Sequence, residues 1–274
     1  KNKESRFREA FEYANKMVPD PGNGYGYFER GKSFLGGKQE QKALADLEKA
    51  AKMLPDDASV QELLADLYLK KQLYKEAVTC FRNALRTNQN DLELYLKTAS
   101  ALENNKNVTE ALNLLTGISV KFSGNAMLYK ATGLLQFKTG NLDDAIVNLE
   151  KYVKVYPNDG EVFRTLGNIY SLKSDFPRAV DAYKMAMPLL KEKNVCRMPI
   201  AEIYIQQKNY SEARKMLNDI LAEKPEKGAH LMMGEVLTHQ GELKSALSHL
   251  EKERSLHGNS VVVQEKIAQL YFRQ

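Results

Sequence analysis

The chain of 274 residues contains only two cysteines, Cys80 and Cys196. Two cysteines allow one disulfide bond at most and exclude a metal cluster built on cysteine, and they are consistent with a reducing compartment. No stretch approaches the ~18 consecutive apolar residues that a membrane-spanning helix needs. The residues from Lys1 onward lead into no apolar segment, so we expect no secretory signal in this sequence. Because the first residue is not Met, we expect a trimmed N-terminus, and we favour the cytoplasm while leaving the compartment open.

The charge of the chain has little excess of one sign. There are 40 Lys and Arg residues against 35 Asp and Glu residues, which gives a net charge of +5. That excess is too diluted to indicate a nucleic-acid partner. The hydrophobic fraction of 43% and the charged fraction of 27% are ordinary for a folded protein and exclude a collagen-like or disordered chain.

Small and large residues recur along the chain with one period. An alanine returns at steps of 34 residues, with one step of 33, at Ala43, Ala77, Ala111, Ala145, Ala179, Ala213 and Ala246. Another small residue stands twelve positions before each of these alanines, at Gly31, Ala65, Ala99, Gly133, Gly167, Ala201 and Gly234. A large residue stands four positions after each, at Leu47, Phe81, Leu115, Leu149, Tyr183, Leu217 and Leu250. Several independent columns that keep one period indicate an internal repeat.

The spacing within each repeat predicts two helices. Apolar residues recur three and four positions apart, which is typical of amphipathic helices. The small columns allow the two helices of a repeat to approach closely, because a bulky side chain there would force their axes apart. Pro55, Pro157 and Pro225 follow the second helices, which a proline cannot continue. No long alternation of apolar and polar residues predicts a strand, so we expect an all-α fold.

The best-kept repeat lies in the middle of the chain. It runs through Gly133, Gly140, Ala145, Leu149 and Pro157, and it resembles the tetratricopeptide repeat, a family with a 34-residue period and this small–large pattern. The resemblance implies a right-handed superhelical solenoid of antiparallel helix pairs. It covers seven repeats, which we place at 24–57, 58–91, 92–125, 126–159, 160–193, 194–226 and 227–260. Residues 1–23 and 261–274 are expected to form one flanking helix each, as pieces of further repeats or as caps.

The junction near residues 186–200 departs most from the pattern. Pro188 falls in the last turn of one predicted helix, and Pro199 falls where the next first helix should already be running. Since proline suits only the first turn of a helix, we expect that helix to begin late, near Met198.

The resemblance implies a protein that binds partner proteins and has no catalytic residues. In such an array the first helices line the concave groove, so polar and aromatic residues on them are the candidates for binding a partner: Lys97, Lys130, Phe137, Lys138, Arg164 and Asn168. A basic middle of this kind favours an acidic partner segment. Arg164 is the strongest candidate, because its planar fork can engage a carboxylate while Asn168 adds a donor one turn along.

Other classes of function have weaker support in the sequence. The alternative is that this segment regulates or targets a longer chain, which is then the enzyme. RNA binding ranks third, because carboxylates such as Glu62, Asp66 and Glu202 interrupt any basic stripe along the groove. The sequence predicts neither a cofactor nor a metal, and leaves self-association open. All four histidines lie in the seventh repeat at gaps of 9, 10 and 8 residues, so we expect His239 at the groove and the others at turns or outer faces.

Overall fold

A computed structural model describes residues 3–18, 23–258 and 260–272 of the chain. Over these residues the chain forms sixteen α-helices and one short 3₁₀ helix, and no strand. The predicted all-α class is therefore confirmed. Residues 1–2, 19–22, 259 and 273–274, which belong to the predicted flanking segments and the end of the seventh repeat, lie outside the described residues. None of the described helices is both long and apolar enough to cross a membrane.

The helices form two compact units that divide between Asn148 and Leu149, within α9. The first unit contains α1 (Lys3–Met17), α2 (Gly24–Gly36), α3 (Glu40–Met53), α4 (Ala58–Lys70), α5 (Tyr74–Thr87), α6 (Leu92–Asn104), α7 (Val108–Gly117), α8 (Ala126–Lys138) and the start of α9 (Leu142–Val155). The second unit contains the rest of α9, α10 (Gly160–Leu172), α11 (Phe176–Ala186), η1 (Met187–Leu189), α12 (Asn194–Gln206), α13 (Tyr210–Glu223), α14 (Ala229–His239), α15 (Leu243–His257) and α16 (Val261–Tyr271).

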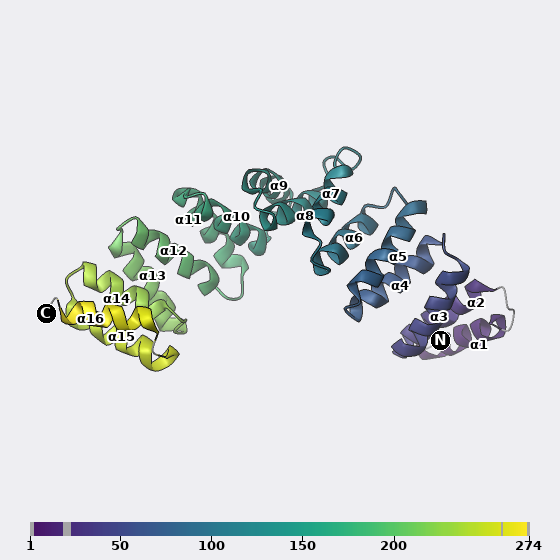
Figure 1. Ribbon diagram of the computed structural model, residues 1–274, viewed down its shortest axis with the longest axis horizontal. Coiled ribbons are helices and arrows are strands. Elements are labelled where there is room, and N and C mark those ends of the chain that lie inside the picture. Colours follow the sequence, from purple (N-terminus) through teal and green to yellow (C-terminus); the bar gives the residue numbers. More distant parts are fainter. Residues whose placement is uncertain (1–2, 19–22, 259, 273–274) are drawn as a thin grey trace. The chain divides into compact units, whose positions relative to one another are not determined.

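Within each unit, successive helices pack side by side (Figure 1). The connection inside each pair is short, so the two helices of a pair run antiparallel. The helices fall within the predicted repeat ranges, but the grouping into seven repeats stays a prediction from the sequence.

An acidic or amide side chain begins five of the first helices. Asn23, Asp57, Asp91, Asn125 and Asp159, 34 residues apart, are the N-caps of α2, α4, α6, α8 and α10, and their side chains accept hydrogen bonds from backbone N–H groups of the first turn. Those N–H groups have no partner within the helix, so each cap stabilises its helix by about 1 kcal/mol.

The small columns lie at the crossing of the two helices of a pair, as predicted. A Cβ added to Gly31 would stand 2.9 Å from Leu47, and one added to Gly167 would stand 2.7 Å from the ring of Tyr183. Contacts this short are repulsive, so the size of these residues sets the distance between the helices.

The turn inside each pair contains one residue with a left-handed backbone. Gly140 and Gly241 occupy this position with φ of 81° and 82°. In the other pairs the same position has a side chain and a φ between 57° and 64°, at Lys38, Gln72, Lys106, Ser174 and Lys208. An L-residue in this conformation is less stable by roughly 1–2 kcal/mol than in the right-handed region.

The predicted late start of the helix after residue 190 is wrong. α12 begins at Asn194 and contains Pro199 in its interior. A proline there removes one hydrogen bond within the helix, but Cys196, Ile200 and Ala201 are fully buried around it. Burial of these apolar side chains offsets the lost bond and keeps the helix continuous.

Pro188 lies in the junction near residues 186–200, which the sequence predicts to be irregular, and the structure is irregular there. α11 stops at Ala186, η1 follows, and Leu190 is extended with φ −105° and ψ 145°. The chain therefore leaves the second helix of this pair early and in an irregular conformation.

Candidate functional site

The structure distributes the predicted groove residues over both units. Lys97 lies on α6, and Lys130, Phe137 and Lys138 lie on α8 of the first unit. Arg164 and Asn168 lie on α10 of the second unit. All six are on first helices of their pairs.

Lys97 joins two neighbouring first helices. Its ammonium nitrogen Nζ lies 2.7 Å from Glu62 Oε1 and 3.0 Å from Asp66 Oδ2, both on α4. Burial alone lowers the pKa of Lys97, but the hydrogen bonds to Glu62 and Asp66 outweigh it and raise this pKa above its usual range. Lys97 is therefore a charged cross-link between α4 and α6, and a partner would have to displace two carboxylates to reach it.

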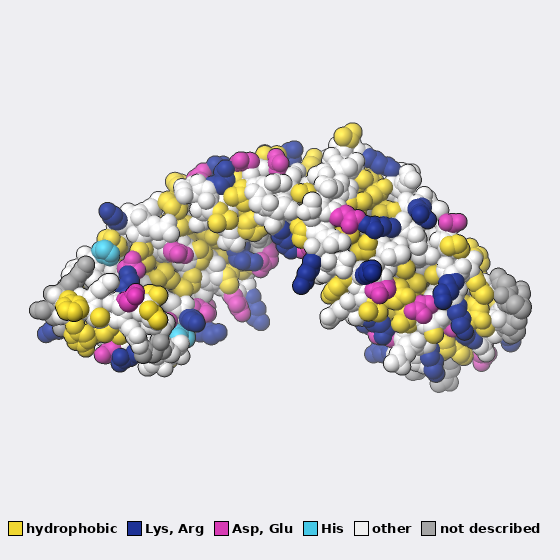
Figure 2. Space-filling view, in the orientation of Figure 1, with side chains coloured by type: hydrophobic (Ala, Val, Ile, Leu, Met, Phe, Trp, Pro, Cys, Tyr) yellow, Lys and Arg dark blue, Asp and Glu magenta, His cyan; other side chains and the backbone are white. Residues whose placement is uncertain are grey.

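Lys138 repeats this arrangement one repeat further along. It forms an ion pair with Glu103 of α6, so α8 is joined to α6 as α6 is to α4. In the second unit Lys266 of α16 lies 3.2 Å from Glu235 of α14. Lysine–carboxylate pairs between successive first helices are thus a recurrent feature, and charges of both signs are interspersed on the face of the first unit seen in Figure 2.

This pairing was missed in the sequence, although the signal was present. Glu62 precedes Lys97 by 35 residues, and Glu103 precedes Lys138 by the same distance. A carboxylate one repeat and one residue before a lysine therefore predicts a bridge between first helices. Because these carboxylates lie on the preceding first helix, the residues of one helix alone suggest a basic patch instead.

Arg164 and Asn168 are occupied within their own helix pair. Arg164 Nη2 lies 2.6 Å from Glu161 Oε2 on the same helix. Asn168 Oδ1 accepts a hydrogen bond of 2.7 Å from the hydroxyl of Tyr183. The guanidinium pair is exposed and spans three residues, so it contributes little and can exchange partners. The Asn168 bond involves a buried tyrosine and fixes the amide.

An apolar groove lies between α6 and α8. It has a volume of about 230 Å³ and is lined by Leu96, Ala99, Ser100, Glu103, Met127, Lys130, Ala131, Leu134 and Leu135. Met127 at its edge is 46% exposed. The groove combines apolar walls with two charged side chains, Glu103 and Lys130, and the Glu103–Lys138 ion pair lies beside it.

Two histidines of the seventh helix pair meet, contrary to the expectation that they line turns or outer faces. His230 of α14 is buried, and its Nδ1 lies 2.8 Å from Nδ1 of His249 on α15. Burial lowers the pKa of both, and the charge of Lys252 lowers each further. Two imidazoles this close cannot both be cationic. The pair was missed because the gaps along the chain reveal contacts within a helix and not between helices.

His239, the two cysteines and candidate metal ligands are the other features considered in the sequence. His239 stacks on the ring of Tyr210, with 4.7 Å between the ring centroids. Cys80 and Cys196 are buried free thiols, and burial raises the pKa of each to about 11, so neither is a reactive thiolate near neutral pH. In the described part of the chain, no group of three or more His, Cys, Asp or Glu side chains is placed to hold a metal ion.

Stacked antiparallel helix pairs with small residues at their crossings define a helical-repeat protein. Models described as tetratricopeptide repeat match residues 28–90, 62–116 and 199–258, and a further one matches 127–159, so the chain belongs to the tetratricopeptide-repeat family.

Among curated proteins, the chain is similar to "Anaphase-promoting complex subunit 3" of Schizosaccharomyces pombe. The two are 23% identical over 213 residues, which are 76% of this chain and 32% of that protein. The chain spans between 10% and 32% of the length of the curated relatives that it matches.

Solved structures show the same fold. A tetratricopeptide repeat protein from Parabacteroides merdae superposes with a TM-score of 0.61 at 15% identity, covering 91% of this chain and 99% of that one. YrrB, described as a TPR protein with an unusual peptide-binding site, has a TM-score of 0.59 at 19% identity, covering 68% of this chain and 95% of that one.

Proposed function

We propose that the chain is a non-catalytic scaffold that binds an extended segment of a partner protein on the first-helix face of its repeats. The observation that supports this most is the apolar groove between α6 and α8, with lysines at and beside it. The family and the fold are consistent with a protein-interaction scaffold. An open groove on stacked helices offers contact area rather than an enclosed site with converging acid, base and nucleophile.

The partner segment in this proposal carries an apolar anchor next to acidic residues. The anchor buries itself against Met127, Leu134 and Leu96, which removes apolar area from water. Acidic side chains contact Lys130 and Lys138, and an incoming carboxylate replaces Glu103 at Lys138. This exchange is feasible because the Lys138 and Glu103 side chains are 51% and 33% exposed, and such pairs contribute no more than about 1 kcal/mol.

The other predicted residues have distinct parts in the proposal. Lys97, held by two carboxylates, keeps α6 against α4 and so maintains one wall of the groove. Phe137, half-buried on α8, adds apolar surface. Arg164 and Asn168 offer a separate contact in the second unit for a partner that also binds there.

A display experiment tests the proposal without a known partner. A library of random peptides is selected on the intact chain and on the variant Met127→Glu, which places a charge at the edge of the groove. Met185→Glu is the matched control, since Met185 on α11 is 53% exposed and Met127 is 46% exposed. We expect the chain and the control to enrich peptides with an apolar residue flanked by Asp or Glu, and Met127→Glu to lose them.

Affinity measurements on an enriched peptide then separate the roles of the cations. Lys130→Ala and Lys138→Ala should each weaken binding by about three- to ten-fold, and the loss should shrink at high salt. Peptides that bind Met127→Glu as well as the intact chain would contradict the proposal.

A further inference from the structure

The irregular junction after α11 forms one side of a second pocket, in the other unit. Pro188 ends the helix, so that Leu189 and Leu190 turn back toward the start of α10. There they lie against Gly160, where an added Cβ would stand 2.8 Å from Leu189 Cβ and 3.0 Å from Leu190 Cγ. The path of this segment therefore depends on a proline and a glycine 28 residues apart.

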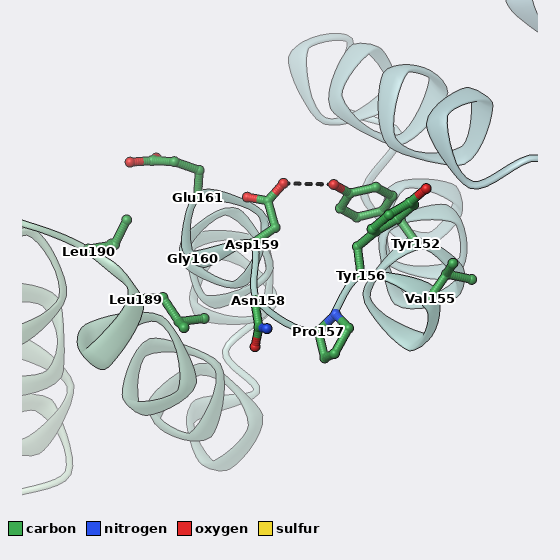
Figure 3. A pocket seen from close by; sticks show the side chains of 10 residues that line it. All are labelled: Tyr152, Val155, Tyr156, Pro157, Asn158, Asp159, Gly160, Glu161, Leu189 and Leu190. Carbon is green, nitrogen blue, oxygen red and sulfur yellow. Dashed lines mark hydrogen bonds between the residues drawn. The ribbon is translucent and has the colours of Figure 1, made fainter.

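The opposite side comes from the end of α9. Figure 3 shows Tyr152, Tyr156 and Val155 on one side of the 157–160 turn, and Leu189 and Leu190 on the other. The two tyrosine rings lie 5.2 Å apart at 31°. We call the resulting cavity, of about 640 Å³, the Tyr156 pocket.

Large apolar and aromatic groups of this pocket are left in contact with water. Val155 is 58% exposed, Tyr156 is 48% exposed and Leu189 is 39% exposed. Tyr152, by contrast, is buried and donates its hydroxyl to Asp159 Oδ2 at 2.9 Å (Figure 3). The pocket thus has a fixed inner wall and an exposed aromatic face.

The charge of the lining is negative. Of the ten described residues that line the pocket, Asp159 and Glu161 are charged and none is basic. Asp159 is held in place, since Oδ1 also accepts a hydrogen bond of 3.2 Å from the Val162 N–H. Glu161 is 64% exposed and pairs with Arg164, three residues along the same helix. Such an exposed pair exchanges easily with another cation.

We propose that the Tyr156 pocket binds an arginine side chain in an extended segment of a partner protein. The guanidinium lies over the face of Tyr156, where a planar cation is attracted to the π electrons, and its fork points toward Asp159 and Glu161. Apolar residues flanking the arginine contact Val155, Leu189 and Leu190. This site is separate from the α6–α8 groove. It binds a basic segment, whereas the groove binds an acidic one.

Methyl NMR on the full chain tests the proposal with a defined probe. The acetylated and amidated tripeptide Leu-Arg-Leu is titrated while the methyl signals of Val155, Leu189 and Leu190 are followed. Two matched probes replace arginine by citrulline, which keeps the shape without the charge, and by glutamate. We expect the arginine peptide to shift these methyl signals with saturation, and to bind about five-fold more tightly than the citrulline peptide.

Two variants localise the effect. Tyr156→Leu keeps apolar bulk and removes the aromatic face, so it should weaken binding of the arginine peptide by about five-fold. Tyr271→Leu is the control, because Tyr271 on α16 is 58% exposed and lies outside the pocket.

Other results would overturn the proposal. These are no shift of the three methyl signals, equal affinity for the arginine and citrulline peptides, or equal losses in the two variants. Met127→Glu should leave this titration unchanged, so failure of the groove and failure of the Tyr156 pocket are distinguishable.

Discussion

Helix pairs α4–α5 and α10–α11 stand 102 residues apart, which is three repeats of 34, and their frameworks correspond closely. In the first pair Tyr68 donates its hydroxyl to Glu48 at 2.9 Å, and in the second Tyr170 donates to Glu150 at 2.5 Å. A tyrosine hydroxyl and its carboxylate partner are therefore retained where each helix pair meets the preceding helix, with Tyr68 half-buried and Tyr170 buried. The pairs differ in charge and at the crossing.

The acidic positions on the first helix of one pair are occupied by a basic and an amide residue in the other. Glu62 and Asp66 of α4 correspond to Arg164 and Asn168 of α10, and Lys97, which holds the two carboxylates, corresponds to Pro199. The carboxylates of α4 form ion pairs with Lys97 of the next first helix, α6. Arg164 and Asn168 of α10 instead bind partners within the α10–α11 pair. The comparison shows that the repeat fixes residue size at the crossings while leaving the charges of the face free to change.

Both helix crossings are filled by one small and one aromatic residue, but the volume is shared differently between the two residues. Ala65 and Phe81 in one pair correspond to Gly167 and Tyr183 in the other. The methyl group absent from Gly167 leaves the ring of Tyr183 room, and its hydroxyl finds a partner in Asn168. In α10–α11, Gly167 provides the space for the Tyr183 ring and Asn168 provides the hydrogen-bond partner of its hydroxyl.

The largest expected effect comes from filling the glycine crossing. Gly167→Leu places atoms where even a Cβ would lie 2.7 Å from the Tyr183 ring, so we expect the free energy of unfolding to fall by about 3 kcal/mol. Urea denaturation followed by circular dichroism measures the loss. The control Lys184→Leu, at an exposed site of α11, should change it by less than about 0.5 kcal/mol. An unchanged urea midpoint for Gly167→Leu would contradict the conclusion that the α10–α11 crossing requires a glycine.

A smaller effect should separate the two charged faces. Lys97→Met leaves Glu62 and Asp66 without their shared cation, and we expect a loss of about 1.5 kcal/mol in unfolding free energy. Arg164→Met removes only an exposed pair within one helix and should cost less than about 0.5 kcal/mol. The same urea experiment compares both, and equal losses would show that the exchange of charges has no structural consequence.

The third effect depends on pH and concerns Tyr183. Tyr183→Phe makes this position like Phe81 and removes one hydrogen bond, which should cost about 1 kcal/mol at pH 8. Burial raises the pKa of Tyr183 to about 12, whereas that of an unfolded chain is near 10. The neutral phenol is thus favoured in the folded state, and its contribution is complete below pH 10 and is lost as the pH rises to 12.

Unfolding midpoints of the chain and of Tyr183→Phe between pH 8 and pH 12 test this point. The advantage of the unmodified chain should diminish above pH 10. A difference that stays constant over that range would mean that the hydroxyl is ionised as easily as in water.

The helices and their crossings could be predicted because they depend on residue size and period alone. Gly167 and Tyr183 stood in the right columns, and the structure places them in contact. The local rule that proline suits only the first turn predicts a late start of α12, but burial of Cys196, Ile200 and Ala201 outweighs the effect of Pro199. A helix's tertiary contacts do not enter such a rule.

The candidate site was less predictable for a geometric reason. The columns place Lys97 and Arg164 on first helices, but they do not say whether a long side chain turns along its own helix or across to the next. The Tyr156 pocket depends on the backbone path of Leu189 and Leu190 after Pro188, and the sequence showed only that this junction is irregular.

The left-handed turn residues are sites at which the stability of the protein could be raised step by step. Five turns carry a side chain where two carry glycine: Lys38, Gln72, Lys106, Ser174 and Lys208. Glycine there relieves roughly 1–2 kcal/mol of backbone strain, and the greater freedom it gives the unfolded chain returns about 0.4–1 kcal/mol of that. The five sites are a repeat or more apart, so their gains should add. Progressive replacement would yield a graded series of proteins with rising heat tolerance and unaltered binding surfaces.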